Sequence, residues 1–219
     1  MSQAGPGLIG RATADTVRAL VRELIETAIL ALLIFLALRF SVQNYRVEGP
    51  SMQPTLVGGQ HLMVNRLVYL RFDPSDLPSF LPFVDDDPER HLFPFHSPHR
   101  GEVVVFRFPD EHRDFVKRII GVSGDTVQID KGQVFLNGQP LDEPYVTQRG
   151  GRDMGAITVA EGSYFVLGDN RPRSDDSRPG PGGSPGDWRP VPVDSVIGRA
   201  WLRYWPWDQL DLMQGSGGP

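Results

Sequence analysis

The fold class is indicated most clearly by residues 126–141, which read TVQIDKGQVFLNGQPL. Two short apolar runs, at 127–129 and 134–136, carry the residue types that strands favour. Between them stands Asp130-Lys131-Gly132, and Asn137-Gly138 follows the second run. Both are turn sequences, because asparagine, aspartate and glycine tolerate the backbone conformations that tight turns require. The stretch therefore predicts a β-hairpin with antiparallel pairing.

Similar apolar runs recur along the chain, separated by turn residues. We expect strands at residues 61–69, 101–108, 116–122, 163–167 and 193–207. The chain also contains 24 glycines and 20 prolines, which favour turns over long helices. No helical pattern alternates with the strands, so the body should not be a parallel α/β fold. The sequence predicts a mainly β body of antiparallel sheet over residues 43–210.

Composition narrows the possible partners. The 219 residues suit one domain, or one domain plus an anchor. The formal net charge of −5, with no basic stripe, argues against nucleic acid as a partner. The chain has no cysteine, which excludes disulfides, thiolate metal sites and a cysteine nucleophile.

An apolar segment precedes this body. Residues 27–38 carry no charge and no helix breaker, but a membrane span needs about 20 residues. Extending the segment to 23–42 reaches that length and includes Glu26 and Arg39 near its ends, where long side chains can reach the head groups. We therefore expect a transmembrane helix at 23–42 and the lipid bilayer as a partner.

The arginines before this segment set its expected orientation. Arg11, Arg18 and Arg22 favour a cytoplasmic location for residues 1–22. The chain would then cross the membrane once, and the body after residue 42 would lie on the outer face. Three alternatives are a cleaved signal peptide, a buried core helix and an amphipathic helix lying in the membrane plane.

Three segments lack a regular pattern. Residues 71–100 are rich in proline and predict an irregular insertion, and residues 179–186 predict a Pro/Gly loop. The Gly-rich end, 211–219, predicts a flexible tail. The histidines and aspartates of the insertion match no recognised metal-ligand spacing, so we expect no metal site.

Ser51 and Lys117 are the candidate catalytic residues. A serine hydroxyl is a poor nucleophile until a base takes its proton. The five histidines are poorly placed in the sequence for that task, although a Ser-His-Asp triad stays open because triads form in space. Lys117 stands in an apolar run of residues 115–120, where burial would favour its neutral form.

A lysine base must first lose its proton. Its ordinary pKa of ~10.4 leaves roughly one amine in a thousand neutral at pH 7. Lowering that pKa to ~7–8 takes on the order of 4 kcal/mol, which burial in an apolar strand can supply. The alternative is that Lys117 faces solvent while its neighbours face the core.

Four segments, in order, resemble the sequence boxes of the bacterial type I signal peptidases. They are residues 49–56 (GPSMQPTL), 100–106 (RGEVVVF), 116–125 (VKRIIGVSGD) and 168–178 (GDNRPRSDDSR). With the closing stretch 197–200, the resemblance covers most of the chain from Arg46 to Trp207. One such segment would be weak evidence for the family, but four segments in the same order are specific.

The resemblance implies a role for each matching residue. Ser51 is the expected nucleophile and Lys117 the expected general base. Ser174 matches the family serine that hydrogen-bonds and orients the lysine amine. Asp176 and Arg178 match the polar residues that support it.

Two further residues of the nucleophile segment bear on substrate binding. Met52 is expected to help shape the substrate pocket beside Ser51. Gly49 stands where some family members carry a serine whose hydroxyl joins the oxyanion hole. The hole would then depend on backbone N–H groups, chiefly that of Ser51, and what completes it is left open.

The function implied by the resemblance is a membrane-bound serine endopeptidase that removes signal peptides from exported preproteins through an acyl-enzyme. The implied location is the bacterial plasma membrane, with the catalytic body on the extracytoplasmic face, and an organelle membrane of bacterial ancestry stays open as an alternative. No cofactor is expected. Two alternatives stay open: a membrane-anchored peptide-binding protein with a degenerate peptidase fold, and a self-cleaving Ser/Lys regulator.

Overall fold

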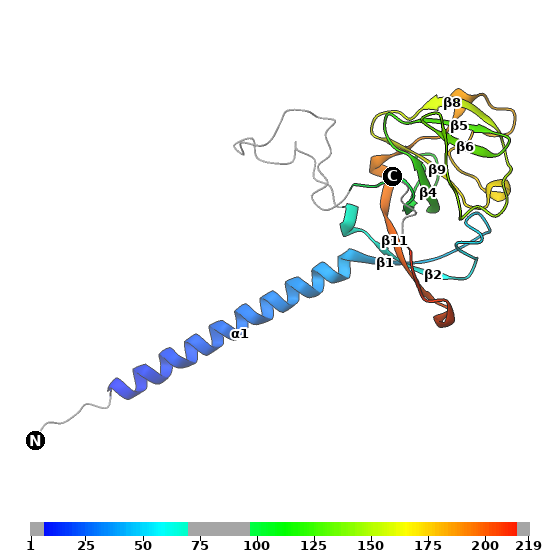
Figure 1. Cartoon of the computed structure of the whole chain (residues 1–219). Helices are drawn as coiled ribbons and strands as arrows, with labels where there is room; N and C mark the ends of the chain where they lie inside the picture. Colours follow the sequence, from blue (N-terminus) through cyan, green and yellow to red (C-terminus); the bar gives the residue numbers. More distant parts are fainter. Residues whose placement is uncertain (1–6, 70–96, 214–219) are drawn as a thin grey trace, which may run out of the picture. The chain divides into compact units, whose positions relative to one another are not determined.

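The computed structural model describes residues 7–69 and 97–213. The chain divides into two compact units, residues 1–41 and residues 42–219 (Figure 1). Most of the predicted insertion 71–100, the first residues of the segment 1–22 and the last six residues of the tail lie outside the described residues.

The first unit is the helix α1 (Gly7–Ser41). A helix was predicted over 23–42, and the observed helix begins well before that range. Among the residues that the structure describes, no helix is long and apolar enough to cross a membrane, so the predicted transmembrane span is not supported. Glu26 and Arg39 bound the uncharged stretch of α1, which is shorter than the ~20 apolar residues of a span.

The second unit is built of strands. Its described strands are β1 (Val42–Arg46), β2 (His61–Asn65), β3 (Val103–Phe106), β4 (Phe115–Gly121), β5 (Thr126–Asp130), β6 (Gln133–Leu136), β7 (Gln139–Pro140), β8 (Met154–Thr158), β9 (Ser163–Leu167), β10 (Val191–Pro192), β11 (Val196–Trp205) and β12 (Asp211–Leu212).

These strands form two antiparallel sheets, as predicted. The larger has the order β1-β2-β11-β3-β4-β9-β10, with β12 added to β11, and the smaller has the order β7-β6-β5-β8. Figure 1 shows β5, β6 and β8 grouped at one end of the unit, with β1 and β2 toward the other. The prediction of a mainly β, antiparallel body is confirmed.

The strand β4 lies near the middle of the larger sheet, between β3 and β9, and contacts all three apolar clusters of the core. Ile119 belongs to a cluster with Phe106 and Val166. Ile120 belongs to a second cluster beneath the smaller sheet, and Val116 packs against a third. Because β4 is held on both sides and by three clusters, a side chain on it has little freedom to move.

The hairpin predicted at 126–141 is present as β5, β6 and β7. Lys131 and Asn137 have φ of 48° and 52°, and each is followed by a glycine with positive φ. Positive φ at both central residues gives a two-residue turn the twist that antiparallel strands require. The turn residues in the sequence therefore explain the hairpin register.

Three predicted strands are shorter than expected, and the one predicted at 101–108 extends only over Val103–Phe106. The segment 61–69 is a strand only to Asn65, whose side-chain Oδ1 accepts the N–H of Val68 at 3.1 Å, and a 3₁₀ turn follows at Leu67–Tyr69. The segment 193–207 begins with a 3₁₀ turn at Val193–Ser195 before β11. At Asn65 the side-chain hydrogen bond to the backbone competes with strand pairing.

The ends of the predicted irregular segments also differ. The loop predicted at 179–186 ends in a 3₁₀ turn, Pro185–Asp187, which Ser184 caps. The flexible tail predicted from residue 211 is wrong at its start, because Asp211 and Leu212 pair with β11. The Met213 N–H also donates to the Trp201 carbonyl at 2.8 Å, and the Met213 side chain is buried.

Candidate active site

Lys117 lies in β4 opposite Val104 of β3, inside the sheet rather than at its edge. Its exposed fraction is 3%, so the alternative that this lysine faces solvent is wrong. Phe115, two residues earlier, lies on the same side of the strand, and the Lys117 Nζ is 5.6 Å from the centre of its ring. The amine is therefore enclosed by apolar surface.

The amine of Lys117 reaches the side chain of Ser51. Nζ donates to Ser51 Oγ at 2.8 Å and to the Val116 carbonyl at 3.1 Å. Burial lowers the pKa of Lys117 from 10.5 to about 8, against the opposing carboxylates of Asp176 and Asp175. About a tenth of the amine is then neutral at pH 7, far more than for an exposed lysine.

Ser51 is presented by a turn between β1 and β2. Gly49 has φ of 78°, a conformation that glycine adopts without strain, and it turns the chain into Pro50-Ser51. Beyond Ser51, Met52 and Leu56 are buried in the cluster that also holds Val47. These buried side chains hold the turn against the sheet.

Met52 does not line the cavity next to Ser51. Its exposed fraction is 1%, and it packs in the core below the turn. The residue thus supports the position of Ser51 from beneath, instead of forming part of the cavity wall as expected from the sequence.

A cavity of about 420 Å³ opens next to the Ser51 and Lys117 side chains. Its walls come from residues 45–49 and 113–117, with Leu62, Val105, Arg173 and Asp175. Its lining combines apolar side chains with charged ones of both signs, and such a surface can contact both the apolar and the polar groups of a peptide segment.

Gly168 separates the nucleophile turn from Ser174. A Cβ at residue 168 would collide with the Ser51 carbonyl oxygen and with the Ser174 side chain. Ser174 Oγ is buried, and within the described part of the chain it has no hydrogen-bond partner. The hydrogen bond expected between Ser174 and the Lys117 amine is therefore not formed in this structure.

Asp176 and Arg178 are fully buried and paired with each other. Arg178 Nε donates to Asp176 Oδ1 at 2.8 Å, and Arg178 Nη2 donates to Oδ2 at 2.9 Å. Asp176 also accepts the Gly168 N–H at 3.2 Å, and Arg178 donates to the Arg171 carbonyl at 2.7 Å. The pair braces residues 168–171 and does not touch Ser51.

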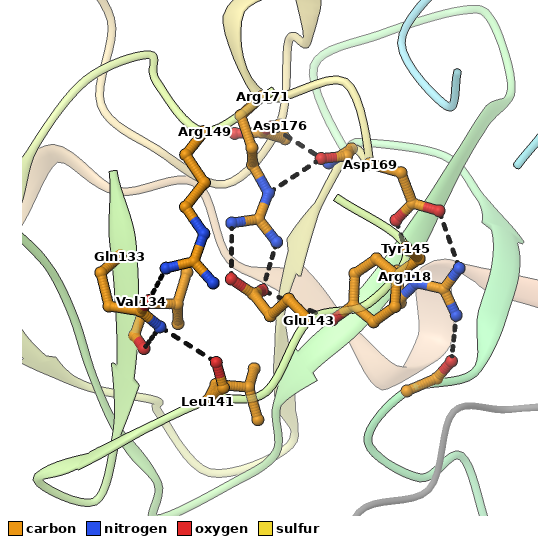
Figure 2. A network of polar contacts seen from close by, with 12 residues as sticks. Arg118, Gln133, Val134, Leu141, Glu143, Tyr145, Arg149, Asp169, Arg171 and Asp176 are labelled. Carbon is orange, nitrogen blue, oxygen red and sulfur yellow. Dashed lines mark hydrogen bonds and ion pairs between the residues drawn. The ribbon is translucent and has the colours of Figure 1, made fainter. Parts of the chain in front are cut away.

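A larger polar network surrounds the same segment (Figure 2). Arg118 makes a two-point contact with Asp169, and its guanidinium lies 3.9 Å from the centre of the Tyr145 ring. Arg171 makes a buried ion pair with Glu143 and donates from Nε to the Gly168 carbonyl at 3.1 Å. The network ties residues 168–171 to β4 and to the segment around Glu143.

Sequence reasoning gave no role to two residues that contact the nucleophile turn. Asp169 Oδ2 accepts a hydrogen bond from Thr55 Oγ1 at 2.5 Å, and Asn170 hydrogen-bonds the backbone on both sides of Ser51. The only signal in the sequence is their place in the box 168–178, because 114 and 119 residues separate them from Thr55 and Ser51.

The sequence of this chain is similar to known proteins of one family. Residues 21–205 match the family described as "Signal peptidase, peptidase S26". A probable signal peptidase I-2 of Synechocystis sp. is 32% identical over 198 residues, which cover 87% of this chain and 76% of that protein. A signal peptidase I of Bacillus licheniformis is 34% identical over 171 residues, 73% of this chain and 79% of that protein.

A crystal structure of a signal peptidase I from Enterococcus faecalis is 34% identical and covers 47% of this chain and 96% of its own, with a TM-score of 0.39. The family match spans most of the chain and includes every residue of the site described above. The chain therefore belongs to the signal peptidase family, peptidase S26.

Proposed function

We propose that this protein is a serine endopeptidase that removes signal peptides from exported preproteins, with Ser51 as nucleophile and Lys117 as general base. The observation that carries the proposal is the 2.8 Å hydrogen bond between Lys117 Nζ and Ser51 Oγ beside a cavity. The family membership supports the reaction class and the substrate class.

The reaction uses the two side chains in turn. Ser51 Oγ bonds to the scissile carbonyl carbon while its proton passes to neutral Lys117 Nζ. The C–N bond then breaks, and the leaving amine of the mature protein takes that proton. Water attacks the resulting Ser51 ester and gives a proton to Lys117, which returns it to Ser51 Oγ as the signal peptide leaves.

The oxygen of each tetrahedral intermediate carries a negative charge, which hydrogen-bond donors must stabilise. Gly49 has no hydroxyl to offer, so the backbone N–H of Ser51 is the proposed donor to the oxyanion. Within the described residues this N–H makes no hydrogen bond, and so it is free for that role.

The supporting residues, Asp176, Arg178 and Ser174, are proposed to act by holding the catalytic groups in place. The Asp176–Arg178 pair braces Gly168, which lies between Ser174 and the Ser51 carbonyl. We propose that the Ser174 hydroxyl contacts the Lys117 amine during the reaction, because that hydroxyl is buried with no partner in the described structure.

A preprotein cleavage assay tests the catalytic pair. Ser51→Ala and Lys117→Met should lose at least 10³-fold in cleavage while they remain folded, because nucleophile and base act as a unit. The chain offers a matched control, since its only other lysine is Lys131 on an exposed hairpin turn. Lys131→Met should cleave as the wild type does. A wild type that binds such peptides without cutting them would favour the binding-protein alternative.

We also propose that α1 associates with a lipid bilayer. Large apolar side chains between Leu24 and Leu36 are exposed along the helix, and water is a poor environment for such a surface. The full chain should sediment with membranes, and Leu30→Asp with Leu33→Asp should release it. Sedimentation that is unchanged in this variant would contradict the role of α1.

The outer face of the plasma membrane is the proposed place of the catalytic body, because exported preproteins emerge there. Protease added to spheroplasts should digest the β-rich unit. Digestion only after lysis would place that unit on the other face.

A further inference from the structure

Asn170 contacts the backbone on both sides of the nucleophile. Its main-chain N–H donates to the Ser51 carbonyl at 3.0 Å, and its side-chain Nδ2 donates to the Pro50 carbonyl at 3.0 Å. The two peptide groups that flank the Ser51 Cα are therefore both held by one residue from a distant segment.

The contact to Pro50 has a direct consequence for the Ser51 N–H. Pro50 C=O and Ser51 N–H belong to the same planar trans peptide, in which the carbonyl and the N–H point in opposite directions. A donor that fixes the direction of the carbonyl oxygen therefore also fixes the direction of the N–H on the other side.

We infer that Asn170 is a positioning residue that aims the Ser51 N–H at the oxyanion. The inference rests on the proposed function, because that N–H has this task only if Ser51 is acylated. The Gln53 N–H also donates to the Pro50 carbonyl, at 3.1 Å, but it belongs to the same turn and moves with it. The Asn170 side chain is therefore the contact that fixes the Pro50–Ser51 peptide relative to the rest of the fold.

Asn170 is itself held in place by its surroundings. Its exposed fraction is 9%, and it follows Asp169, whose carboxylate is locked by Arg118. Within the described structure, Asn170 Oδ1 is buried with no hydrogen-bond partner. The side-chain amide thus makes one polar contact there, through its nitrogen to Pro50.

The effect should be confined to the transition state. The charge on the substrate oxygen develops only as the tetrahedral intermediate forms, so a misaimed donor lowers kcat and leaves ground-state binding unchanged. A general loss of stability would not lower kcat while leaving the ground-state affinity for substrate unchanged.

The experiment compares Asn170→Ala with Thr55→Val in the full chain. Thr55 bonds Asp169 and so joins the same two segments, but it does not touch the Ser51 peptide. Two probes of one signal-peptide sequence are used: an aldehyde, whose oxygen becomes an oxyanion on Ser51, and a reduced amide, which has no carbonyl oxygen at the cut.

Asn170→Ala should lower kcat 10- to 100-fold with KM within twofold, in the range of a weakened oxyanion donor. It should weaken aldehyde binding by a similar factor and leave reduced-amide binding unchanged. Thr55→Val should leave all four quantities within about twofold. Should Asn170→Ala not fold, Asn170→Asp keeps the shape, removes the donor to Pro50 and should give the same pattern.

Two results would overturn the inference in different ways. If the wild type cleaves and Asn170→Ala retains kcat, or loses affinity equally for both probes, Asn170 does not aim the N–H and the proposed function stands. If the wild type does not cleave and Ser51 forms no adduct with the aldehyde, the proposed function fails and the role of Asn170 fails with it.

Discussion

Arg118 and Asp169 form a buried ion pair through two hydrogen bonds, 2.9 Å from Nε to Oδ1 and 2.7 Å from Nη2 to Oδ2. Arg118 directly follows the lysine, and Asp169 directly precedes Asn170. The pair therefore joins the strand that carries Lys117 to the segment that holds the Ser51 turn. It is a direct link between the segments next to the two candidate catalytic side chains.

Removing one partner of this pair should be costly. Arg118→Met leaves the Asp169 carboxylate buried without its main partner and should lower the free energy of unfolding by about 3–5 kcal/mol. Arg107→Met is the control, because the Arg107–Asp114 pair is partly exposed and should be worth about 1 kcal/mol or less. Urea unfolding of both variants measures the difference. Equal losses would show that burial of the Arg118 pair has no special weight.

The rate of cleavage should rise with pH through the pKa of Lys117. Burial lowers this pKa to about 8, and only the neutral amine accepts the Ser51 proton. Below pH 8, kcat/KM should fall about tenfold per pH unit, as the neutral fraction does. An NMR titration of ¹³C-labelled lysine checks the assignment, since the chain has two lysines and Lys131→Met removes one signal. A rate midpoint that does not match the Lys117 titration would contradict its role as the base.

The burial that lowers the pKa of Lys117 also lowers the free energy of unfolding wherever the lysine is protonated. The unfolded lysine titrates near 10.5 and the folded one near 8, so below pH 8 both states are protonated and folding must bury an ammonium group. Between these values the unfolded state binds more protons, and stability rises with pH. Lys117→Met should therefore be up to about 3 kcal/mol more stable than the wild type at pH 6. Its advantage should shrink between pH 8 and 10.5; an advantage independent of pH would contradict this explanation.

Gly168 should tolerate no side chain. In Gly168→Ala the new methyl group meets the Ser51 carbonyl and the Ser174 side chain, so the nucleophile must shift. A displacement of about 1 Å can cost 10²-fold in kcat. In Gly121→Ala the new methyl meets the Val127 and Val159 side chains at 2.9 and 3.1 Å, away from Ser51. Both variants should be less stable, but only Gly168→Ala should lose kcat, as measured on the folded protein.

Local patterns explain how much of this fold could be predicted. The strand of Val103–Phe106 is a run of buried apolar residues, and the hairpin turns contain residues that accept positive φ. The strand β8 (Met154–Thr158) was missed, because its sequence MGAIT has little apolar alternation and its pairing with β5 is decided in space. Periodicity reports which face of a strand is buried, and it does not report pairing partners.

The same distinction between local patterns and contacts in space applies to the candidate site. Local residue patterns were enough to predict a mainly antiparallel β chain and to find Ser51 and Lys117 in ordered segments that match the family, because both features can be recognised in short stretches of sequence. The three-dimensional packing was needed to show that Lys117 is buried against Ser51 Oγ and that Met52 lies in the core. It was also needed to show that Asn170 holds the Ser51 backbone and that Ser174 Oγ has no hydrogen-bond partner among the described residues. Such contacts join residues 66 to 120 positions apart, and only the packing of the sheet brings them within hydrogen-bond distance.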